Sequence, residues 1–197
     1  SYLSMPSGRM VAVATPDGFK PSGKCIVHFH GLRIASWDKT KRGTIDHFKF
    51  DTIIPKDTTL IAPIASDGSY DLPKYYGTGF QETLKFVKTK TGIECKNVTV
   101  SAHSAGGRVA QALVQSSPKT FQRLLLFDAT YSATTSPYTT WFKADSARIG
   151  WAVSRKSDNV YAHAATIKGP GFTNVLSATS DHWATVIRYM PLFLKEM

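Results

Sequence analysis

One stretch of the sequence decides the fold: Val98-Thr99-Val100-Ser101-Ala102-His103-Ser104-Ala105-Gly106-Gly107. Its first half is rich in β-branched residues and has the continuous apolar character of a strand buried on both faces. Small residues flank Ser104, and a helical pattern carrying Val109 and Leu113 begins at once. A turn this sharp tolerates only small neighbours, because the serine is held in a strained backbone conformation with its hydroxyl projecting outward. The stretch therefore predicts a strand, a tight turn and a helix, with Ser104 exposed at the turn.

Outside this stretch, short apolar runs alternate with longer helical patterns. We expect strands at residues 10–15, 25–30, 59–64, 97–102, 123–127, 149–153 and 172–176. Helical patterns lie before Gly92, between Gly107 and Ser116, and after Ser180 or Asp181. Strands that alternate with helices along the whole chain favour a mostly parallel sheet with helices on both faces. We therefore expect a single three-layer α/β domain that spans residues 1–197.

Length and composition exclude several classes of protein. The chain has 197 residues, of which 42% are hydrophobic, and a domain of this size buries roughly 70% of the surface that its unfolded chain exposes. This composition excludes a disordered chain, a collagen-like repeat and a disulfide-knotted miniprotein. The longest unbroken apolar run, Met10–Ala14, is far shorter than the ~20 residues of a membrane-spanning helix. Because the chain begins with Ser1, we expect a processed or trimmed product.

The formal net charge is +10, and it is spread along the chain. Residues 1–100 contain 14 basic and 9 acidic side chains, and residues 101–197 contain 10 and 5. The sequence has no basic tail and no block of five like charges. We therefore expect a generally cationic surface that favours anionic surroundings such as cell-wall polymers, lipid headgroups or acidic polysaccharide. We expect no specific nucleic-acid site.

The segment from Ala102 to Gly106 resembles the nucleophile elbow of the α/β-hydrolase superfamily, with Ala102 in place of the usual first glycine. The resemblance implies that Ser104 is a catalytic nucleophile and that the backbone N–H of Ala105 is one oxyanion donor. His30-Gly31 is similar to the turn that supplies the second donor in this superfamily, which would be the N–H of Leu32 or of Gly31. The competing interpretation is a helix N-terminus rich in Ser and Gly that performs no chemistry.

The resemblance also implies a general base. His182 follows the last expected strand and stands at the head of the last helix, where the superfamily places the histidine that takes the proton from the serine and returns it to the leaving group. Taken alone, His182 would be a residue in the first turn of a helix capped by Ser180 or Asp181. Together with Ser104 upstream, the catalytic interpretation is favoured.

Two residues compete for the part of the acid that orients His182. Asp158 follows the later of two candidate strands, which the superfamily uses more often, but its neighbours also fit a helix N-cap. Asp128 ends a wholly apolar strand, where a carboxylate is costly to bury unless a partner such as an imidazole uses it. We favour Asp128 on this ground and keep Asp158 as the alternative.

A metal site is not expected. His28 and His30 share one face of an expected strand, but no third ligand follows at a recognisable zinc spacing. The resemblance implies a serine hydrolase that needs no cofactor.

Cys25 and Cys95 both lie near the amino ends of expected strands. The resemblance implies that these strands are parallel neighbours, so that the two cysteines could form a disulfide. Two free buried thiols are the alternative. A disulfide would favour a secreted or otherwise extracytoplasmic protein.

The resemblance therefore predicts a serine hydrolase with the catalytic triad Ser104, His182 and Asp128. Carboxylic esters are the favoured substrates, and amides are the alternative. The chain is short, so only residues 130–147, with Tyr131, Tyr138, Trp141 and Phe142, could form a small lid or rim; ordinary helix packing is favoured for this segment. An open cleft on a cationic body suggests a bulky, polymeric or anionic substrate. The alternative function is a non-catalytic binding module of the same fold that docks on anionic polymer or cell-surface material.

Overall fold

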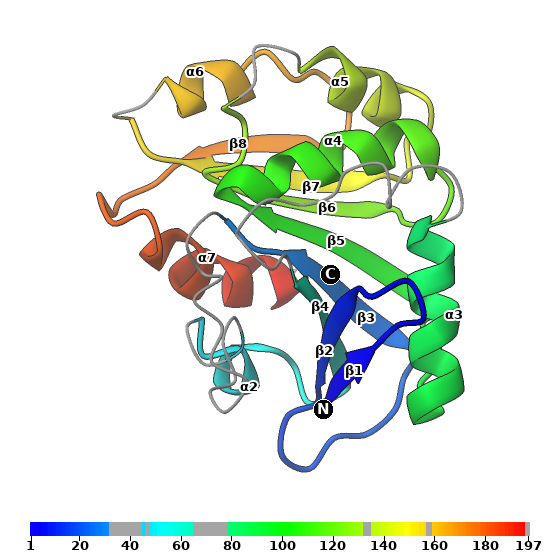
Figure 1. Cartoon of the computed structure of the whole chain (residues 1–197). Helices are drawn as coiled ribbons and strands as arrows, with labels where there is room; N and C mark the ends of the chain where they lie inside the picture. Colours follow the sequence, from blue (N-terminus) through cyan, green and yellow to red (C-terminus); the bar gives the residue numbers. More distant parts are fainter. Residues whose placement is uncertain (32–44, 46–47, 65–78, 132–134, 157–158, 196–197) are drawn as a thin grey trace.

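One sheet organises the computed structural model, which describes residues 1–31, 45, 48–64, 79–131, 135–156 and 159–195 (Figure 1). Within these residues the sheet has eight strands. In order across the sheet they are β1 (Tyr2–Ser4), β2 (Met10–Ala14), β4 (Thr58–Ile64), β3 (Lys24–Phe29), β5 (Asn97–His103), β6 (Arg123–Phe127), β7 (Ile149–Ser154) and β8 (Phe172–Leu176).

The strands from β4 to β8 are parallel, and only β1 and β2 pair antiparallel with their neighbours. The carboxyl ends of the parallel strands therefore meet at one edge of the sheet. The expected strands are present, with ends that differ from the prediction by at most one residue. Strand β1 was not predicted, because three half-exposed residues at the edge of a sheet carry no readable pattern.

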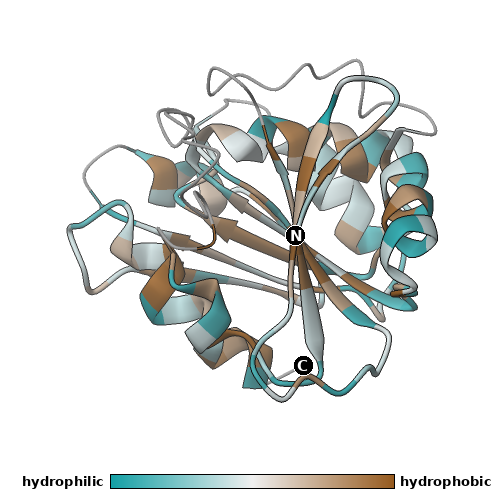
Figure 2. Cartoon of the chain, turned by 60° about the horizontal axis from the view of Figure 1, so that its bottom comes forward, coloured by the Kyte–Doolittle hydropathy of each residue, from teal (hydrophilic) through white to brown (hydrophobic). Residues whose placement is uncertain are grey.

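Helices cover both faces of the sheet, as expected for a three-layer α/β fold. On one face lie α3 (Gly79–Thr91), α4 (Gly107–Ser116), α5 (Ser136–Lys143) and α6 (Val160–Ala164), and on the other lie α2 (Phe50–Ile53) and α7 (Ala184–Lys195). Successive strand residues point to opposite faces: Leu124 and Leu126 of β6 belong to the first core, and Leu125 and Phe127 belong to the second. Figure 2 shows the apolar residues concentrated in the central strands. None of the helices in the described part of the chain has the length and apolar content of a membrane crossing.

The aromatic residues of the segment considered as a lid belong mainly to the core. Tyr138, Trp141 and Phe142 of α5 are buried, and the Tyr138 hydroxyl donates a hydrogen bond of 2.8 Å to the carbonyl oxygen of Gly107 at the start of α4. Burial also raises the pKa of Tyr138. Helix α5 thus anchors α4 and is not a lid, whereas Tyr131 remains 44% exposed.

Cys25 and Cys95 form a disulfide, with their Cα atoms 5.5 Å apart. Cys25 lies at the beginning of β3, and its partner in the ladder is Val98 of β5, so the parallel pairing of these strands brings Cys95 alongside. The bond fastens the connection before β5 to the centre of the sheet. It closes a loop between residues 70 positions apart in the sequence.

Removing this disulfide is expected to destabilise the protein considerably. A loop of 70 residues corresponds to a loss of about 4 kcal/mol in the free energy of unfolding, because the unfolded chain regains the conformational freedom that the cross-link removed. Urea unfolding of the double variant Cys25→Ala/Cys95→Ala would measure the loss, with the reduced wild type as a control. A difference of less than about 1 kcal/mol would contradict this expectation.

Candidate active site

Ser104 stands in a tight turn between β5 and α4. Strand β5 ends at His103, a single 3-10 turn spans Ser104–Gly106, and α4 begins at Gly107. The φ angle of Ser104 is 52°, in the left-handed region that non-glycine residues rarely adopt. The predicted strand, turn and helix are therefore all present. A strained serine of this kind persists only where the surrounding structure enforces it.

The surroundings of the turn leave no room for larger residues. A Cβ atom added to Gly106 would lie 2.1 Å from the carbonyl oxygen of Phe29, and one added to Gly107 would lie 1.9 Å from that of Ala129. The turn is thus packed between the backbone at the end of β3 and the backbone that follows β6. This packing explains why small residues follow Ser104.

Gly31, one of the predicted oxyanion residues, lies against the serine. A Cβ atom at position 31 would stand 2.7 Å from Ser104 Cβ and 3.2 Å from Ser104 Oγ. Ala105, the second predicted contributor, is the next residue of the 3-10 turn. Leu32 lies outside the described residues. The structure therefore brings Gly31 and Ala105 to the sides of the Ser104 hydroxyl.

Asp128 and His182 form a hydrogen bond at this edge of the sheet. Asp128 directly follows β6, its side chain is fully buried, and its Oδ2 accepts a hydrogen bond of 2.9 Å from His182 Nδ1. A carboxylate only accepts hydrogen bonds, so this contact places the proton on Nδ1 and leaves Nε2 as an acceptor. Asp158, the alternative acid, lies outside the described residues.

Arg155 is the second partner of Asp128, and it was not predicted from the sequence. The backbone N–H of Arg155 donates to Asp128 Oδ1 at 2.7 Å, and its Nε donates to Oδ2 at 2.6 Å. Its Nη1 donates to the carbonyl oxygen of Ser180 at 3.3 Å. The signal in the sequence was slight. Arg155 directly follows β7, and Asp128 directly follows the neighbouring strand β6.

These contacts keep Asp128 ionised. Burial alone would raise the pKa of the carboxyl, but the hydrogen bonds from His182 and from the backbone and side chain of Arg155, together with the charge of Arg155, outweigh it. The pKa of Asp128 consequently lies below its ordinary value of 3.8.

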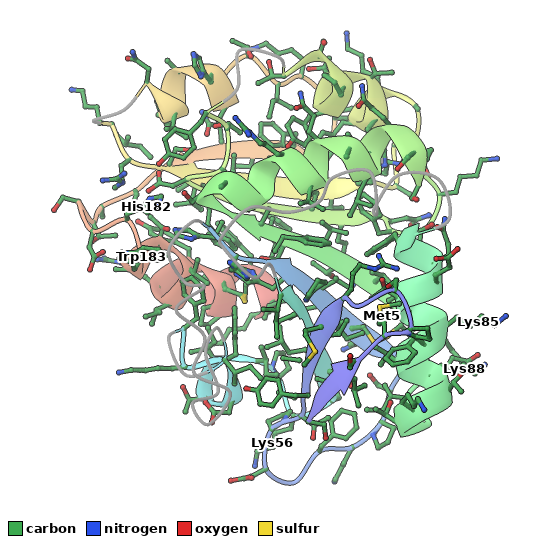
Figure 3. All side chains as sticks on the ribbon, in the orientation of Figure 1. Met5, Lys56, Lys85, Lys88, His182 and Trp183 are labelled. Carbon is green, nitrogen blue, oxygen red and sulfur yellow. A yellow bond between two sulfur atoms is a disulfide. The ribbon has the colours of Figure 1, made fainter. Side chains whose placement is uncertain are left out.

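His182 is also held through its backbone, just before α7 (Figure 3). Its carbonyl oxygen accepts hydrogen bonds from His103 Nε2 at 3.0 Å and from Thr185 Oγ1 at 2.8 Å. The ring of His103, the residue before Ser104, lies 4.3 Å from the ring of His182. His103 thus links the serine turn to the histidine loop, a contact that sequence patterns do not reveal.

The last helix begins later than predicted. Helix α7 starts at Ala184, two residues after His182. Asp181 Oδ1 accepts the N–H of Trp183 at 2.9 Å, which closes a turn ahead of the helix. His182 therefore belongs to the turn and not to the first helical turn. Asp181 is occupied with this turn.

Ser104 and His182 reach the same edge from different elements, but no hydrogen bond joins Ser104 Oγ to the His182 ring in the described part of the chain. Such bonds are often long in ligand-free hydrolytic sites and shorten once a substrate is bound. The ring of Tyr131 lies 6.3 Å from that of His182 and is the exposed aromatic neighbour of the site.

The two histidines considered as metal ligands have other roles. His28 Nδ1 forms a hydrogen bond of 2.9 Å with Ser101 Oγ, and His30 Nδ1 donates to the carbonyl oxygen of Gly31 at 2.7 Å. Burial lowers the pKa of both rings, and the neighbouring His103 and His30 lower that of His28 further. Among the described residues, no group of three His, Cys, Asp or Glu side chains is arranged to hold a metal ion.

A cavity of about 300 Å³ lies elsewhere, at the amino ends of β5, β6 and β7. Its lining includes Lys96, Lys119, Phe121 and Arg123. Ser104 and Asp128 follow the carboxyl ends of β5 and β6, so this cavity is at the opposite edge of the sheet and does not belong to the site.

Replacing Gly31 with alanine is expected to disturb the serine. The new Cβ would come within 2.7 Å of Ser104 Cβ, so the turn must shift, at a cost of about 1–3 kcal/mol in the free energy of unfolding. A displacement of about 1 Å can lower a reaction rate roughly 100-fold. Urea unfolding would measure the loss of stability, and the rate at which a fluorophosphonate modifies Ser104 would measure the loss of reactivity. Gly18→Ala is the control for the labelling rate: its φ of 72° makes alanine costly for stability there, but no atom lies within 4 Å of a Cβ, so the labelling of Ser104 should be unchanged. An equal fall in labelling rate for the two substitutions would contradict this expectation.

Replacing Asp128 with asparagine is expected to destabilise the protein in a pH-dependent way. Removing one partner of a buried charge pair costs roughly 3–5 kcal/mol. Because the pKa of Asp128 is lower in the folded protein than its ordinary 3.8, the carboxylate's contribution is complete above pH of about 4 and declines as the pH falls through the folded pKa. Urea unfolding at pH 7 and pH 3 would measure the difference between the wild type and Asp128→Asn. That difference should shrink at pH 3, while exposed Asp17→Asn should show little effect; a constant difference would contradict this interpretation.

Comparison with known proteins supports the fold through structure alone. No family model matches the sequence, and no curated protein shows significant sequence similarity to it. Solved structures match along the chain. BioJ, a virulence factor of Francisella, superimposes with a TM-score of 0.68 and 13% sequence identity over 100% of this chain and 84% of that chain.

Two further solved structures that match this chain are described by name as hydrolases or hydrolase homologues. An alpha-beta serine hydrolase homologue from Coxiella burnetii matches with a TM-score of 0.64 and 13% identity, over 100% of this chain and 96% of that chain. Poly(aspartic acid) hydrolase-1 from a Sphingomonas species matches with a TM-score of 0.60 and 15% identity, over 95% of this chain and 93% of that chain. With the sheet order and the serine turn described above, these matches establish that the chain has the α/β-hydrolase fold.

Proposed function

We propose that the protein is a serine hydrolase that cleaves carboxylic esters through an acyl-enzyme on Ser104. The observation that carries the proposal is the 2.9 Å hydrogen bond between His182 Nδ1 and buried Asp128 Oδ2, at the same edge of the sheet as strained Ser104. A nucleophile, a base and an orienting acid are the three groups that acyl transfer to a serine requires. Amide bonds are accessible to the same chemistry.

In the first half of the reaction, Ser104 Oγ attacks the carbonyl carbon of the ester while His182 Nε2 takes the hydroxyl proton. The resulting imidazolium is stabilised by Asp128 through the Nδ1–H hydrogen bond. When the tetrahedral intermediate collapses, the bond from the carbonyl carbon to the leaving oxygen breaks. The leaving alkoxide receives the proton from His182 and departs as an alcohol, so that the acyl group remains on Ser104.

In the second half, water replaces the alcohol. His182 Nε2 removes a proton from the water as the water oxygen attacks the acyl carbon, and the proton then returns to Ser104 Oγ as the ester bond to the serine breaks. The products are a carboxylic acid and the free enzyme. The sequence of bond changes requires no metal or organic cofactor.

The negative charge of both tetrahedral intermediates needs hydrogen-bond donors. The N–H of Ala105 is one, and the N–H of Gly31 or Leu32 is the other. The close packing of Gly31 against Ser104 supports this assignment. Backbone donors fixed before the reaction stabilise the developing oxyanion without reorganising during the step.

The substrate we propose is bulky and anionic. Tyr131, at 44% exposure, lies beside His182, and α5 packs into the core instead of forming a lid. The net charge of +10 attracts polyanions. One structure of the same fold is a poly(aspartic acid) hydrolase by name. Because poly(aspartic acid) is an amide-linked polyanion, carboxylate-bearing polymers with ester links and with amide links are suitable first substrates to test.

We also propose that the protein works outside the cytoplasm. The disulfide between Cys25 and Cys95 supports this location, because such bonds persist in oxidising compartments and are rare where thiols are kept reduced.

Covalent labelling with a fluorophosphonate tests the proposed function. We expect the wild type to gain the mass of one adduct on Ser104 at neutral pH, and we expect the adduct to be absent from Ser104→Ala and from denatured protein. Exposed Ser7→Ala is the matched control and should label like the wild type. Intact-mass measurement followed by peptide mapping would locate the adduct.

A panel of neutral and anionic esters, with matching amides, would then rank substrates for the wild type beside Ser104→Ala. If the folded wild type neither forms the adduct nor cleaves any of these compounds, the enzyme proposal is wrong. The non-catalytic module that docks on anionic polymer would then be the better interpretation.

A further inference from the structure

Arg155 and Asp128 are brought together by the register of two parallel strands. Phe127 of β6 pairs with Val153 of β7, and the N–H of Asp128 donates to the carbonyl oxygen of Val153 at 2.8 Å. Asp128 is the first residue after β6, and Arg155 is the first after β7. The end of β7 therefore presents a cation to the carboxylate that ends β6.

Arg155 holds both oxygens of this carboxylate. Its backbone N–H reaches Oδ1 at 2.7 Å and its Nε reaches Oδ2 at 2.6 Å. With both oxygens engaged by one residue, rotation of the carboxylate about its terminal torsion would break two charge-assisted hydrogen bonds inside the protein. Asp128 consequently keeps Oδ2 directed at His182.

The guanidinium of Arg155 and the carboxylate of Asp128 both lie beside Nδ1 of His182. Oδ2 accepts from both Arg155 Nε and His182 Nδ1, and the Nη2 of Arg155 lies 3.3 Å from that Nδ1. An arginine only donates hydrogen bonds, so of these two neighbours only the Asp128 carboxylate can accept a hydrogen bond from Nδ1. A carboxylate that turned away would remove this acceptor, and the tautomer with its proton on Nε2, which cannot accept a proton from a serine, would gain population.

We propose that Arg155 is a positioning residue that locks the Asp128 carboxylate so that His182 stays in the Nδ1–H tautomer. This inference rests on the proposed hydrolase function, although it also makes a statement about the resting protein that can be tested without turnover. Arg155 acts through Asp128 and takes no part in bond making. The side chain is 18% exposed and Asp128 is fully buried, so water competes little for their hydrogen bonds.

The first test compares Arg155→Met with Arg155→Lys and with Arg188→Met. Arg188 is exposed on α7, so its replacement removes the same charge without touching the site. We expect kcat on the best ester of the panel, or the maximal rate of fluorophosphonate labelling, to fall about 10- to 100-fold in Arg155→Met. The KM should change by less than about threefold, since Arg155 acts on the base and not on substrate binding. Arg155→Lys should recover only part of the rate, because an ammonium cannot reproduce the fork, and methylguanidinium should partly rescue Arg155→Met.

The second test does not depend on activity. In the Ser104→Ala background, the ¹⁵N chemical shifts of the His182 ring report which nitrogen carries the proton at neutral pH. We expect the Nδ1–H tautomer when Arg155 is present, a mixture that includes Nε2–H in Arg155→Met, and no change in Arg188→Met. If Arg155→Met does not fold, Arg155→Lys, which keeps the charge but loses the Nε contact, is measured in the same way.

The two failures are distinguishable. An inactive, unlabelled wild type would overturn the hydrolase, and the ¹⁵N spectrum would still decide whether Arg155 sets the tautomer. An active enzyme whose labelling rate stays within twofold in Arg155→Met, with His182 unchanged in its tautomer, would overturn the part assigned to Arg155.

Discussion

A buried carboxylate constrains the edge of the sheet where Ser104 and His182 meet. The Asp128 side chain is fully buried, and an ionised carboxylate in such surroundings is costly unless charged or hydrogen-bonded partners offset the loss of water. Two partners do so, the imidazole of His182 and the guanidinium of Arg155. Their contacts, at 2.9 and 2.6 Å, lower the pKa of Asp128 despite its burial. The same contacts fix the orientation of the histidine.

The parallel sheet makes this arrangement possible. It delivers Ser104, Asp128 and Arg155 to one edge from the ends of three neighbouring strands, β5, β6 and β7. At the opposite edge, the disulfide between Cys25 and Cys95 ties the start of β3 to the segment before β5. Tyr138 holds the first residue of α4 from the side. A rigid frame of this kind can hold the left-handed Ser104 turn, which an isolated segment would not retain.

The alternation of apolar strands with helical patterns was sufficient to predict the fold, and Asp128 was nominated because it ends a wholly apolar strand. Ser104 and His182 were nominated through the resemblance of their segments to the α/β-hydrolase superfamily. The preference for Asp128 came from the cost of burying a carboxylate, which is a local property of a sequence. Arg155 and His103 could not be nominated in this way. Their importance depends on strand register and on ring contacts between residues far apart in the chain, such as the 4.3 Å between His103 and His182. For α5, the pattern of aromatic residues allowed both a rim and a core helix, and burial decided for the core.

The proposal that Asp128 is the acid that orients His182 can be tested by comparing the labelling rates of three proteins. The second-order rate constant for fluorophosphonate labelling of Ser104 would be measured for the wild type, Asp128→Asn and Asp158→Asn under identical conditions. If Asp128 orients His182, we expect a loss on the order of 1,000-fold or more for Asp128→Asn, because the base is left in the wrong tautomer. We expect a rate within about threefold of the wild type for Asp158→Asn. A large loss for Asp158→Asn alone would contradict the proposal.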